Sequence, residues 1–262
     1  MNLAHSVIKT GLQAQDAQLA IIAHNMANMS TVGFKRDRAV FQDLFYQIEQ
    51  PPATTGQDGV PASSGIQRGT GTRLVGTQKV FTEGNAILTH QPLDVAIRGS
   101  GFLQVQMNNG EVGYTRDGQL RRNQDGQLTT MQGQLLIPEI TLPVEAKSIS
   151  IHENGTVWVT LPGVTEPNEV GQLSLASFAN PAGLLALGAN LFKETISSGV
   201  PIVGNPGEDG LGILKSGELE GSNVQAVEQM VDLMMAQRTY EMSTKVLSGA
   251  DTMLQYLAQS VR

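Results

Sequence analysis

The sequence predicts an α+β protein in which long N- and C-terminal helices pair as a coiled-coil-like core and enclose a central antiparallel β domain. Two patterns predict this arrangement. Both ends of the chain lack proline and carry apolar residues at helical spacing, whereas the middle alternates apolar and polar residues between glycine-containing turns. A chain of 262 residues is also long enough to bury a substantial core, in one domain or in two.

The N-terminal helix is expected over residues 1–29, which contain no proline and a single glycine. Only Lys9 and Asp16 carry a full charge before Lys35, so most sides of this helix are expected to be buried against other helices. Gly33 can end the helix in a left-handed cap. The apolar stripe that repeats every three or four residues includes Ile8, Leu12, Leu19, Ile22 and Met26.

The C-terminal helix is expected from Ser222, a plausible N-cap, to Arg262. Apolar residues repeat every seven positions along it, and Val231 is among those that widen the stripe. A seven-residue repeat favours a coiled coil, while a long core helix of a globular domain is the alternative. The repeat consists of Leu233, Tyr240, Leu247, Leu254 and Val261.

The middle of the chain predicts a compact antiparallel β domain over about residues 75–195. Turn signals at Asn109-Gly110, Asp117-Gly118 and Asp125-Gly126 are eight residues apart, which is the spacing of a tight meander. Alternating apolar and polar residues indicate strands at 93–97, 102–105, 149–151, 157–161 and 172–175.

These patterns divide the chain into three parts. Residues 1–34 and 222–262 are expected to form a terminal helical polymerisation domain, residues 35–74 an extended arm or linker, and residues 75–221 a β-rich outer domain. Within the arm, the proline and glycine content of residues 50–72 is typical of a loop.

Composition excludes several classes of function. The net charge of −7 and the absence of a basic run argue against nucleic acid as a partner. With no cysteine, the chain can form neither disulfides nor thiolate metal sites. The longest apolar run near the N-terminus is residues 19–23, too short for a secretory signal or a membrane span, so the protein is not expected to be membrane-inserted.

No pattern in the sequence predicts an enzyme. The nucleophile, phosphate-binding, dinucleotide and zinc-protease motifs are absent, and no catalytic, cofactor-binding or metal-ligating residue is predicted. The histidines at 5, 24, 90 and 152 lack partners at ligand spacing. Glu218 and Glu220 are expected to face solvent. A structural subunit that assembles through weakly charged terminal helices fits these observations better.

Four separated segments resemble the bacterial flagellar rod and hook family. Residues 24–36 (HNMANMSTVGFKR) are similar to the family pattern N-N-L-A-N-x-x-T-x-G-F-K-R, from which they depart at His24 and Met26. Residues 93–102, 114–118 and 222–255 match its other motifs, so the resemblance runs nearly end to end. Three residues of the first motif, Asn28, Gly33 and Phe34, join the predicted self-assembly residues.

Within this family, the resemblance implies a structural subunit of the straight distal rod, which transmits torque from motor to hook. Hook proteins carry an additional outer domain for which this chain has no room, whereas residues 63–73 after a proline-rich stretch resemble distal-rod subunits. A proximal rod subunit is the alternative within the family. A secreted β-rich adhesin is the alternative from another class, although it would not need matched helices at both ends.

The resemblance also implies partners and a location. The expected partners are further copies of the chain, the proximal rod and hook proteins, the P and L ring proteins, the rod cap and the flagellar export apparatus. The rod crosses the periplasm and outer membrane, and its subunits are exported without a cleaved signal peptide. An arm near residues 46–73 would stiffen the rod. The residues assigned to this arm are prolines, which restrict the backbone, and glycines, which leave it free to turn: Pro51, Pro52, Pro61, Gly65, Gly69 and Gly71.

Overall fold

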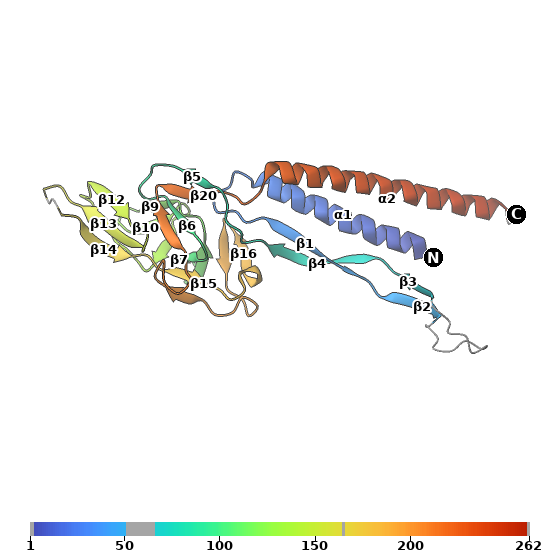
Figure 1. The fold of residues 1–262 in the computed structure, drawn as a ribbon, viewed down its shortest axis with the longest axis horizontal. Coiled ribbons are helices and arrows are strands. Elements are labelled where there is room, and N and C mark those ends of the chain that lie inside the picture. The colour runs from blue at the N-terminus through green and yellow to red at the C-terminus, as the bar shows by residue number, and fades with distance from the viewer. Residues whose placement is uncertain (1–2, 51–65, 164–165, 261–262) are drawn as a thin grey trace. The chain divides into compact units, whose positions relative to one another are not determined.

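A computed structural model describes residues 3–50, 66–163 and 166–260 and shows a mixed α+β fold (Figure 1). The chain forms two compact units. The first, here named the helical unit, comprises residues 1–26, 37–78 and 225–262. The second, the β unit, comprises residues 27–36 and 79–224. The chain therefore passes through the helical unit three times and through the β unit twice, in alternation.

The helical unit contains α1 (Leu3–Ala27) and α2 (Ala226–Ser260), the two α-helices of the described residues. They lie side by side and antiparallel, because early residues of α1 meet late residues of α2 (Figure 1). Side-chain hydrogen bonds join them at three levels: His5 with Asp251 at 2.7 Å, Gln15 with Ser243 at 3.5 Å, and Asn25 with Gln229 at 3.3 Å.

The predicted coiled-coil-like pairing of the two helices is wrong. A coiled-coil seam would bury the seven-residue repeat of α2, yet Tyr240 is exposed and Leu233 and Leu247 are only partly buried. Within the described residues, strands outnumber the two helices many times over. The terminal helices are thus one part of a largely β structure.

The C-terminal helix also begins later than Ser222. Residues 222–225 remain extended or bent, and the Nδ2 atom of Asn223 donates hydrogen bonds to the carbonyls of Val80 at 2.7 Å and Thr82 at 3.3 Å. A side chain held in this way fixes the segment to the β unit, and α2 begins only at Ala226. Among the described residues, no helix combines the length and apolarity needed to cross a bilayer.

The helical unit also carries two antiparallel strand pairs. β1 (Asp37–Asp43) pairs with β4 (Thr72–Lys79), and β2 (Tyr46–Gln50) pairs with β3 (Ile66–Gly69). The two pairs follow one another as a ribbon, and the amide of Leu44 donates to the carbonyl of Gly71 at 2.9 Å between them. Much of the sequence expected to be a linker is therefore hydrogen-bonded strand.

The β unit is built around one nine-stranded sheet with the order β16-β17-β8-β7-β11-β10-β9, in which β15 pairs with both β7 and β18. Three further sheets pair β12-β13-β14, β19-β6 and β20-β5. A 3₁₀ turn, η1, covers Pro181–Gly183. The strands are β5 (Ala86–Leu88), β6 (Val95–Arg98), β7 (Phe102–Gln106), β8 (Val112–Thr115), β9 (Leu120–Arg122), β10 (Leu128–Thr130), β11 (Leu135–Ile137), β12 (Ser148–Ile151), β13 (Thr156–Thr160), β14 (Asn168–Gln172), β15 (Leu175–Ser177), β16 (Leu185–Gly188), β17 (Leu191–Lys193), β18 (Ile202–Gly204), β19 (Ile213–Ser216) and β20 (Glu218–Glu220).

The predicted tight meander is correct at two of its three turns. Asn109-Gly110 joins β7 to its neighbour β8, and Asp125-Gly126 joins β9 to its neighbour β10. At Asp117-Gly118 the chain does not turn back to pair β9 with β8. The free side of β8 pairs with β17 instead, and β9 pairs with β10. Val95 donates its amide to the Gly118 carbonyl at 3.0 Å, so this turn ties β6 to the sheet.

The core of the β unit consists of two clusters of buried side chains. The larger is aliphatic and joins β6, β7, β13, β15 and β19 with the loops between them; Val95, Val157, Val159, Leu175 and Leu214 are its most enclosed members. The smaller is aromatic, with edge-to-face contacts among Phe81, Phe102, Phe178, Phe192 and Tyr114.

Candidate functional site

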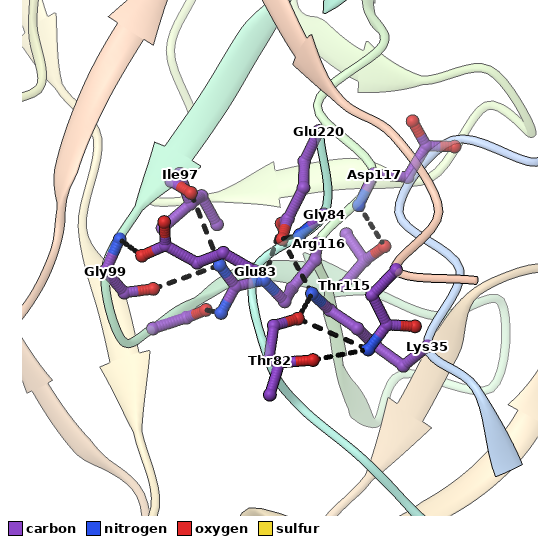
Figure 2. Close-up of polar contacts among 12 residues, drawn as sticks. Lys35, Thr82, Glu83, Gly84, Ile97, Gly99, Thr115, Arg116, Asp117 and Glu220 are labelled. Atoms are coloured by element: carbon purple, nitrogen blue, oxygen red, sulfur yellow. Dashed lines mark hydrogen bonds and ion pairs between the residues drawn. The ribbon is translucent and has the colours of Figure 1, made fainter. Parts of the chain in front are cut away.

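A buried ionic cluster lies in the β unit where residues from three distant parts of the sequence meet. Lys35, Arg116 and Glu220 are only 1%, 2% and 3% exposed. The Lys35 Nζ atom donates to one Glu220 carboxylate oxygen at 2.6 Å, and the Arg116 Nε atom donates to the other at 2.7 Å. Figure 2 shows the carboxylate between the two cations. One buried anion therefore serves two buried cations.

Backbone groups satisfy the remaining hydrogen bonds of the two cations. Lys35 also donates to the Thr82 carbonyl at 2.6 Å. The guanidinium of Arg116 donates to three carbonyls of the β6–β7 connection, those of Ile97, Gly99 and Gly101, at 3.0–3.3 Å (Figure 2). Since a buried charge is costly unless it is both paired and hydrogen-bonded, this network is the condition under which both cations can be enclosed.

The pKa shifts in the cluster follow from its composition of two cations and one anion. Burial alone would raise the pKa of Glu220, but the charges of Arg116 and Lys35 and their hydrogen bonds outweigh it and leave the pKa below its ordinary value. The pKa of Lys35 is lowered, because burial and the repulsion from Arg116 outweigh its attraction to Glu220. Glu220 is therefore firmly ionised at neutral pH.

The expectation that Glu218 and Glu220 face solvent is wrong for Glu220. Residues two apart on a strand share a face, but these two differ in depth. Glu218 pairs with the half-exposed Arg98, whereas Glu220 lies in the buried cluster at the end of β20. Sequence reasoning also missed Lys35 and Arg116. Two features of the sequence could have pointed to them. Both cations belong to motifs that carry the family resemblance, and charged residues are rare in this chain, so a charge within such a motif stands out.

The turn before Lys35 is held by close packing. Gly33 has a φ of +70°, and a Cβ atom there would lie 2.9 Å from the backbone nitrogen of Asp117. Its amide donates to the Glu220 carbonyl at 2.8 Å. The Phe34 ring is buried with the Lys79 ammonium 5.1 Å from its centroid. These contacts give Gly33 and Phe34 a role within the chain, and their role in assembly stays a prediction.

In the helical unit, the side-chain amide of Asn25 forms hydrogen bonds with both backbone groups of Asp37, as a neighbouring strand would. Its side chain is 2% exposed, accepts a hydrogen bond from the Asp37 amide at 2.8 Å and donates one to the Asp37 carbonyl at 2.9 Å. It also donates to the Gln229 side chain. One amide thereby holds the start of β1 against α1 and reaches α2, a role that sequence reasoning did not assign.

The predicted self-assembly residues fall into three environments. Ile22, Gly33 and Phe34 are buried within the chain. Val231 and Tyr240 are exposed. The others with described side chains are partly buried: Ile8, Leu12, Leu19, Met26, Asn28, Leu233 and Leu247.

Leu254 lies within α2. Of the predicted arm positions, Pro51, Pro52, Pro61 and Gly65 lie outside the described residues, whereas Gly69 ends β3 and Gly71 follows it.

The side of α2 that faces away from α1 is rich in exposed apolar side chains. With 3.6 residues per turn, the contacts of Gln229, Ser243 and Asp251 define the side that faces α1. Nine exposed apolar side chains fall on the opposite half of the circumference: Val227, Met230, Val231, Met234, Met235, Met242, Val246, Met253 and Tyr256. This exposed apolar side of α2 has no partner within the described part of the chain.

The strand ribbon of the helical unit is similarly uncovered. Its exposed large apolar residues are Val40, Phe41, Phe45, Tyr46, Ile48, Ile66, Leu74 and Val75. Phe45, between β1 and β2, is 91% exposed. A two-stranded ribbon is only marginally stable by itself, and this one leaves its apolar side chains exposed to water.

The described residues contain no group of three or more potential ligands that could hold a metal ion. The described residues do contain a buried ionic cluster in the β unit and two exposed apolar surfaces in the helical unit. Exposed apolar surfaces of this kind are typical of proteins that bind other proteins.

Three family models match separate parts of the chain. Residues 7–35 match the flagella basal body rod protein model, residues 96–159 the flagellar hook protein FlgE/F/G D1 domain, and residues 215–260 the flagellar basal body rod FlgEFG protein C-terminal model. A flagellar basal-body rod protein FlgG from Buchnera aphidicola is 45% identical over 97% of both chains. The chain belongs to the flagellar basal-body rod protein family.

Other relatives in this family agree. A FlgG protein of Caulobacter vibrioides is 44% identical over 95% of this chain and 96% of its own length. The rod protein FlgF of Salmonella typhimurium is 32% identical over 89% of this chain and 88% of its own length. The family predicted from sequence is therefore confirmed. The FlgG relatives from Buchnera and Caulobacter, to which the distal-rod prediction corresponds, are more similar to this chain than the FlgF relative from Salmonella is. Cluster residues Lys35, Arg116 and Glu220 each lie in a different matched segment.

Replacing Glu220 should destabilise the β unit strongly. Glu220→Gln leaves two buried cations without their anion, and we expect a loss of about 3–5 kcal/mol in the free energy of unfolding. The control Glu218→Gln removes the same charge from a pair with the half-exposed Arg98 and should cost much less. Urea denaturation of both variants measures this difference, and equal losses would contradict the role of the cluster.

Stability should also depend on pH through Glu220. Because its folded pKa lies below the ordinary value of 4.5, its contribution is present above pH 4.5 and is lost as the pH falls through the folded pKa. The wild-type protein should therefore lose part of its advantage over Glu220→Gln as the pH is lowered below 4.5. Parallel urea titrations at a series of acidic pH values test this, and a constant difference would contradict it.

Gly33 should tolerate no side chain. Gly33→Ala combines a positive φ with a contact to the Asp117 backbone, whereas Gly133→Ala has a φ of +85° but open space around it. We expect a loss of about 1–2 kcal/mol for Gly133→Ala from conformation alone, and a loss larger by about 1–3 kcal/mol for Gly33→Ala from overpacking. Urea midpoints that rank the two variants in the opposite order would refute this explanation.

Proposed function

We propose that this chain is a structural subunit of the flagellar distal rod and that it polymerises with further copies through its helical unit. The observation that carries the proposal is the exposed apolar side of α2. In a protein of the basal-body rod family, a second copy is the partner that this surface has to meet.

The physical argument rests on what the isolated chain leaves in water. Nine apolar side chains on one side of a helix lose the stabilisation that burial would give, at about 25 cal/mol for each Å² left exposed. Arg238, Glu241 and Lys245 lie on the same side of α2. Arginine is enriched in protein interfaces, and the other two charges would fit best at a polar rim. The methionines adapt their shape to neighbouring side chains more readily than branched residues do.

The remaining roles follow from this assembly. The neighbours proposed for the chain are its own copies, the proximal rod and hook proteins, the P and L ring proteins, the rod cap and the export apparatus. The rod would cross the periplasm and outer membrane, and its subunits would be exported without a cleaved signal peptide. A non-enzymatic, mechanical role is supported by the packed ionic cluster, whose charged groups are used up within the chain.

The strand ribbon is proposed to be the arm that stiffens the rod. Its apolar residues project from both strand pairs, and Phe45 at their junction is almost fully exposed. Clamping such a ribbon between neighbouring subunits would bury these side chains and remove the freedom of a two-stranded structure.

A charge on the exposed side of α2 should prevent polymerisation. Val231→Asp places a carboxylate among the nine apolar side chains, where desolvation opposes packing. Gln237→Asp adds the same charge on the same helix at an exposed position outside this set. Filaments seen by negative staining should be abolished by the first substitution and retained with the second, while both keep the wild-type melting temperature. Normal filaments from Val231→Asp would refute the proposed interface.

Phe45→Ser should soften the rod without unfolding the subunit. Since the ring has almost no contacts within the chain, its removal should leave the melting temperature unchanged, yet it removes the most exposed apolar group of the arm. Gln67→Ser, an exposed change on β3, is the control. Tomograms of isolated basal bodies should show curved distal rods only for Phe45→Ser. Rods as straight as those of the control would show that Phe45 does not clamp the arm.

A further inference from the structure

An open groove lies in the β unit beside the hairpin of β12 and β13. Its volume is about 890 Å³, and its wall includes residues from β14 and β19 as well as the hairpin turn. The turn is anchored to β19, because the amide of Leu214 donates to the Glu153 carbonyl at 3.0 Å. The groove thus has a frame that is fixed by hydrogen bonds and formed within one unit.

The central feature of the groove is Trp158. On β13 the side chains of Val157 and Val159 point into the core and are fully buried, so the intervening Trp158 points outward. Its indole Nε1 donates to the Thr156 hydroxyl at 3.1 Å, which fixes the orientation of the ring. The His152 ring stands against it at 73°, with 6.0 Å between the ring centres. Two rings at an angle form one corner of the groove.

Polar side chains with both signs of charge surround this corner. Glu169 lies directly opposite Trp158 on the neighbouring strand β14, and Glu153 and Lys215 complete the wall. Within the described residues, these three side chains make no hydrogen bond or ion pair with the rest of the chain. Their acceptors and donors are available to a ligand, beside an aromatic ring whose position is fixed.

We propose that this groove binds a neutral oligosaccharide of hexopyranose units. A pyranose ring presents an apolar C–H face that can pack on the indole, and a rim of hydroxyl groups that can donate to Glu153 and Glu169 and accept from Lys215. Such convergence of a few polar groups on an aromatic wall is the usual composition of a small-molecule site. Hydrogen bonds to the charged groups would supply most of the specificity.

Other ligand classes fit less well. The two carboxylates outnumber the one ammonium group, so an anionic ligand would meet net repulsion. A purely apolar ligand would strip water from three charged side chains without replacing it. A cationic ligand would be attracted by the carboxylates and the indole, but it would have to displace or avoid Lys215 in the same groove.

The groove can be probed directly because Trp158 is the single tryptophan of the chain. Purified full-length protein is titrated with tetra-N-acetylchitotetraose and, separately, with cellotetraose while the indole fluorescence is recorded. We expect a saturable change with at least one of the two sugars. Glu169→Gln, which retains the tryptophan, should weaken this binding by about tenfold, as expected for loss of one charge-assisted hydrogen bond.

The control variant is Glu145→Gln, an exposed carboxylate outside the groove that should leave the binding unchanged. Equal melting temperatures of the variants show that each is folded. The proposal is overturned if neither sugar changes the fluorescence, if Glu169→Gln binds as tightly as Glu145→Gln, or if only a cationic probe such as arginine methyl ester produces the response. The titration uses unassembled protein, so its outcome is independent of whether the chain polymerises.

Discussion

The β unit depends on the sharing of Glu220 between Lys35 and Arg116. Three residues that are far apart in sequence each contribute one charge; Glu220 compensates both buried cations, and the two cations together keep Glu220 ionised. Carbonyl groups of the β6–β7 connection and of Thr82 complete the hydrogen bonding of the cations. Such a network specifies one arrangement of its strands, because any shift would leave a charge buried without a partner.

Much of the fold could be predicted from local patterns. The terminal helices have helical spacing, and the strands predicted at 102–105 and 157–161 correspond to β7 and β13. Burial alternates along β13 as the sequence pattern predicts, whereas β7 is buried on both faces. The relation between elements could not be predicted in the same way. The seven-residue repeat of α2 is compatible with several partners. Only the structure shows that α1 does not bury it as a coiled-coil seam, because Tyr240 is exposed and Leu233 and Leu247 are partly buried.

The sequence motifs contain residues of the ionic cluster, but the sequence does not show which of these residues meet in the fold. Family motifs pointed to Gly33 and Phe34, yet nothing in a single sequence indicates that Lys35 meets a carboxylate 185 positions away. The alternation of β20 also misled, because Glu218 and Glu220 lie on the same face of a strand but at different depths. Long-range pairing of charges is set by topology, and local propensity carries no information about it.

The backbone contacts around the cluster have a consequence for how this architecture can vary. The amide of Gly33 donates to the Glu220 carbonyl at 2.8 Å, and the amide of Arg36 donates to the Asn223 side chain at 2.7 Å. Asn223 also donates to the Val80 carbonyl, and the Val80 amide donates to the Arg36 carbonyl. Arg36, Val80 and Asn223 lie beside the points where the chain leaves, re-enters and finally leaves the β unit, so these points adjoin one another. A body whose connections to its neighbour are gathered in one place can vary elsewhere as an inserted domain does. Loops and strands away from these connections can be lengthened, shortened or exchanged while the spacing of the connections stays the same.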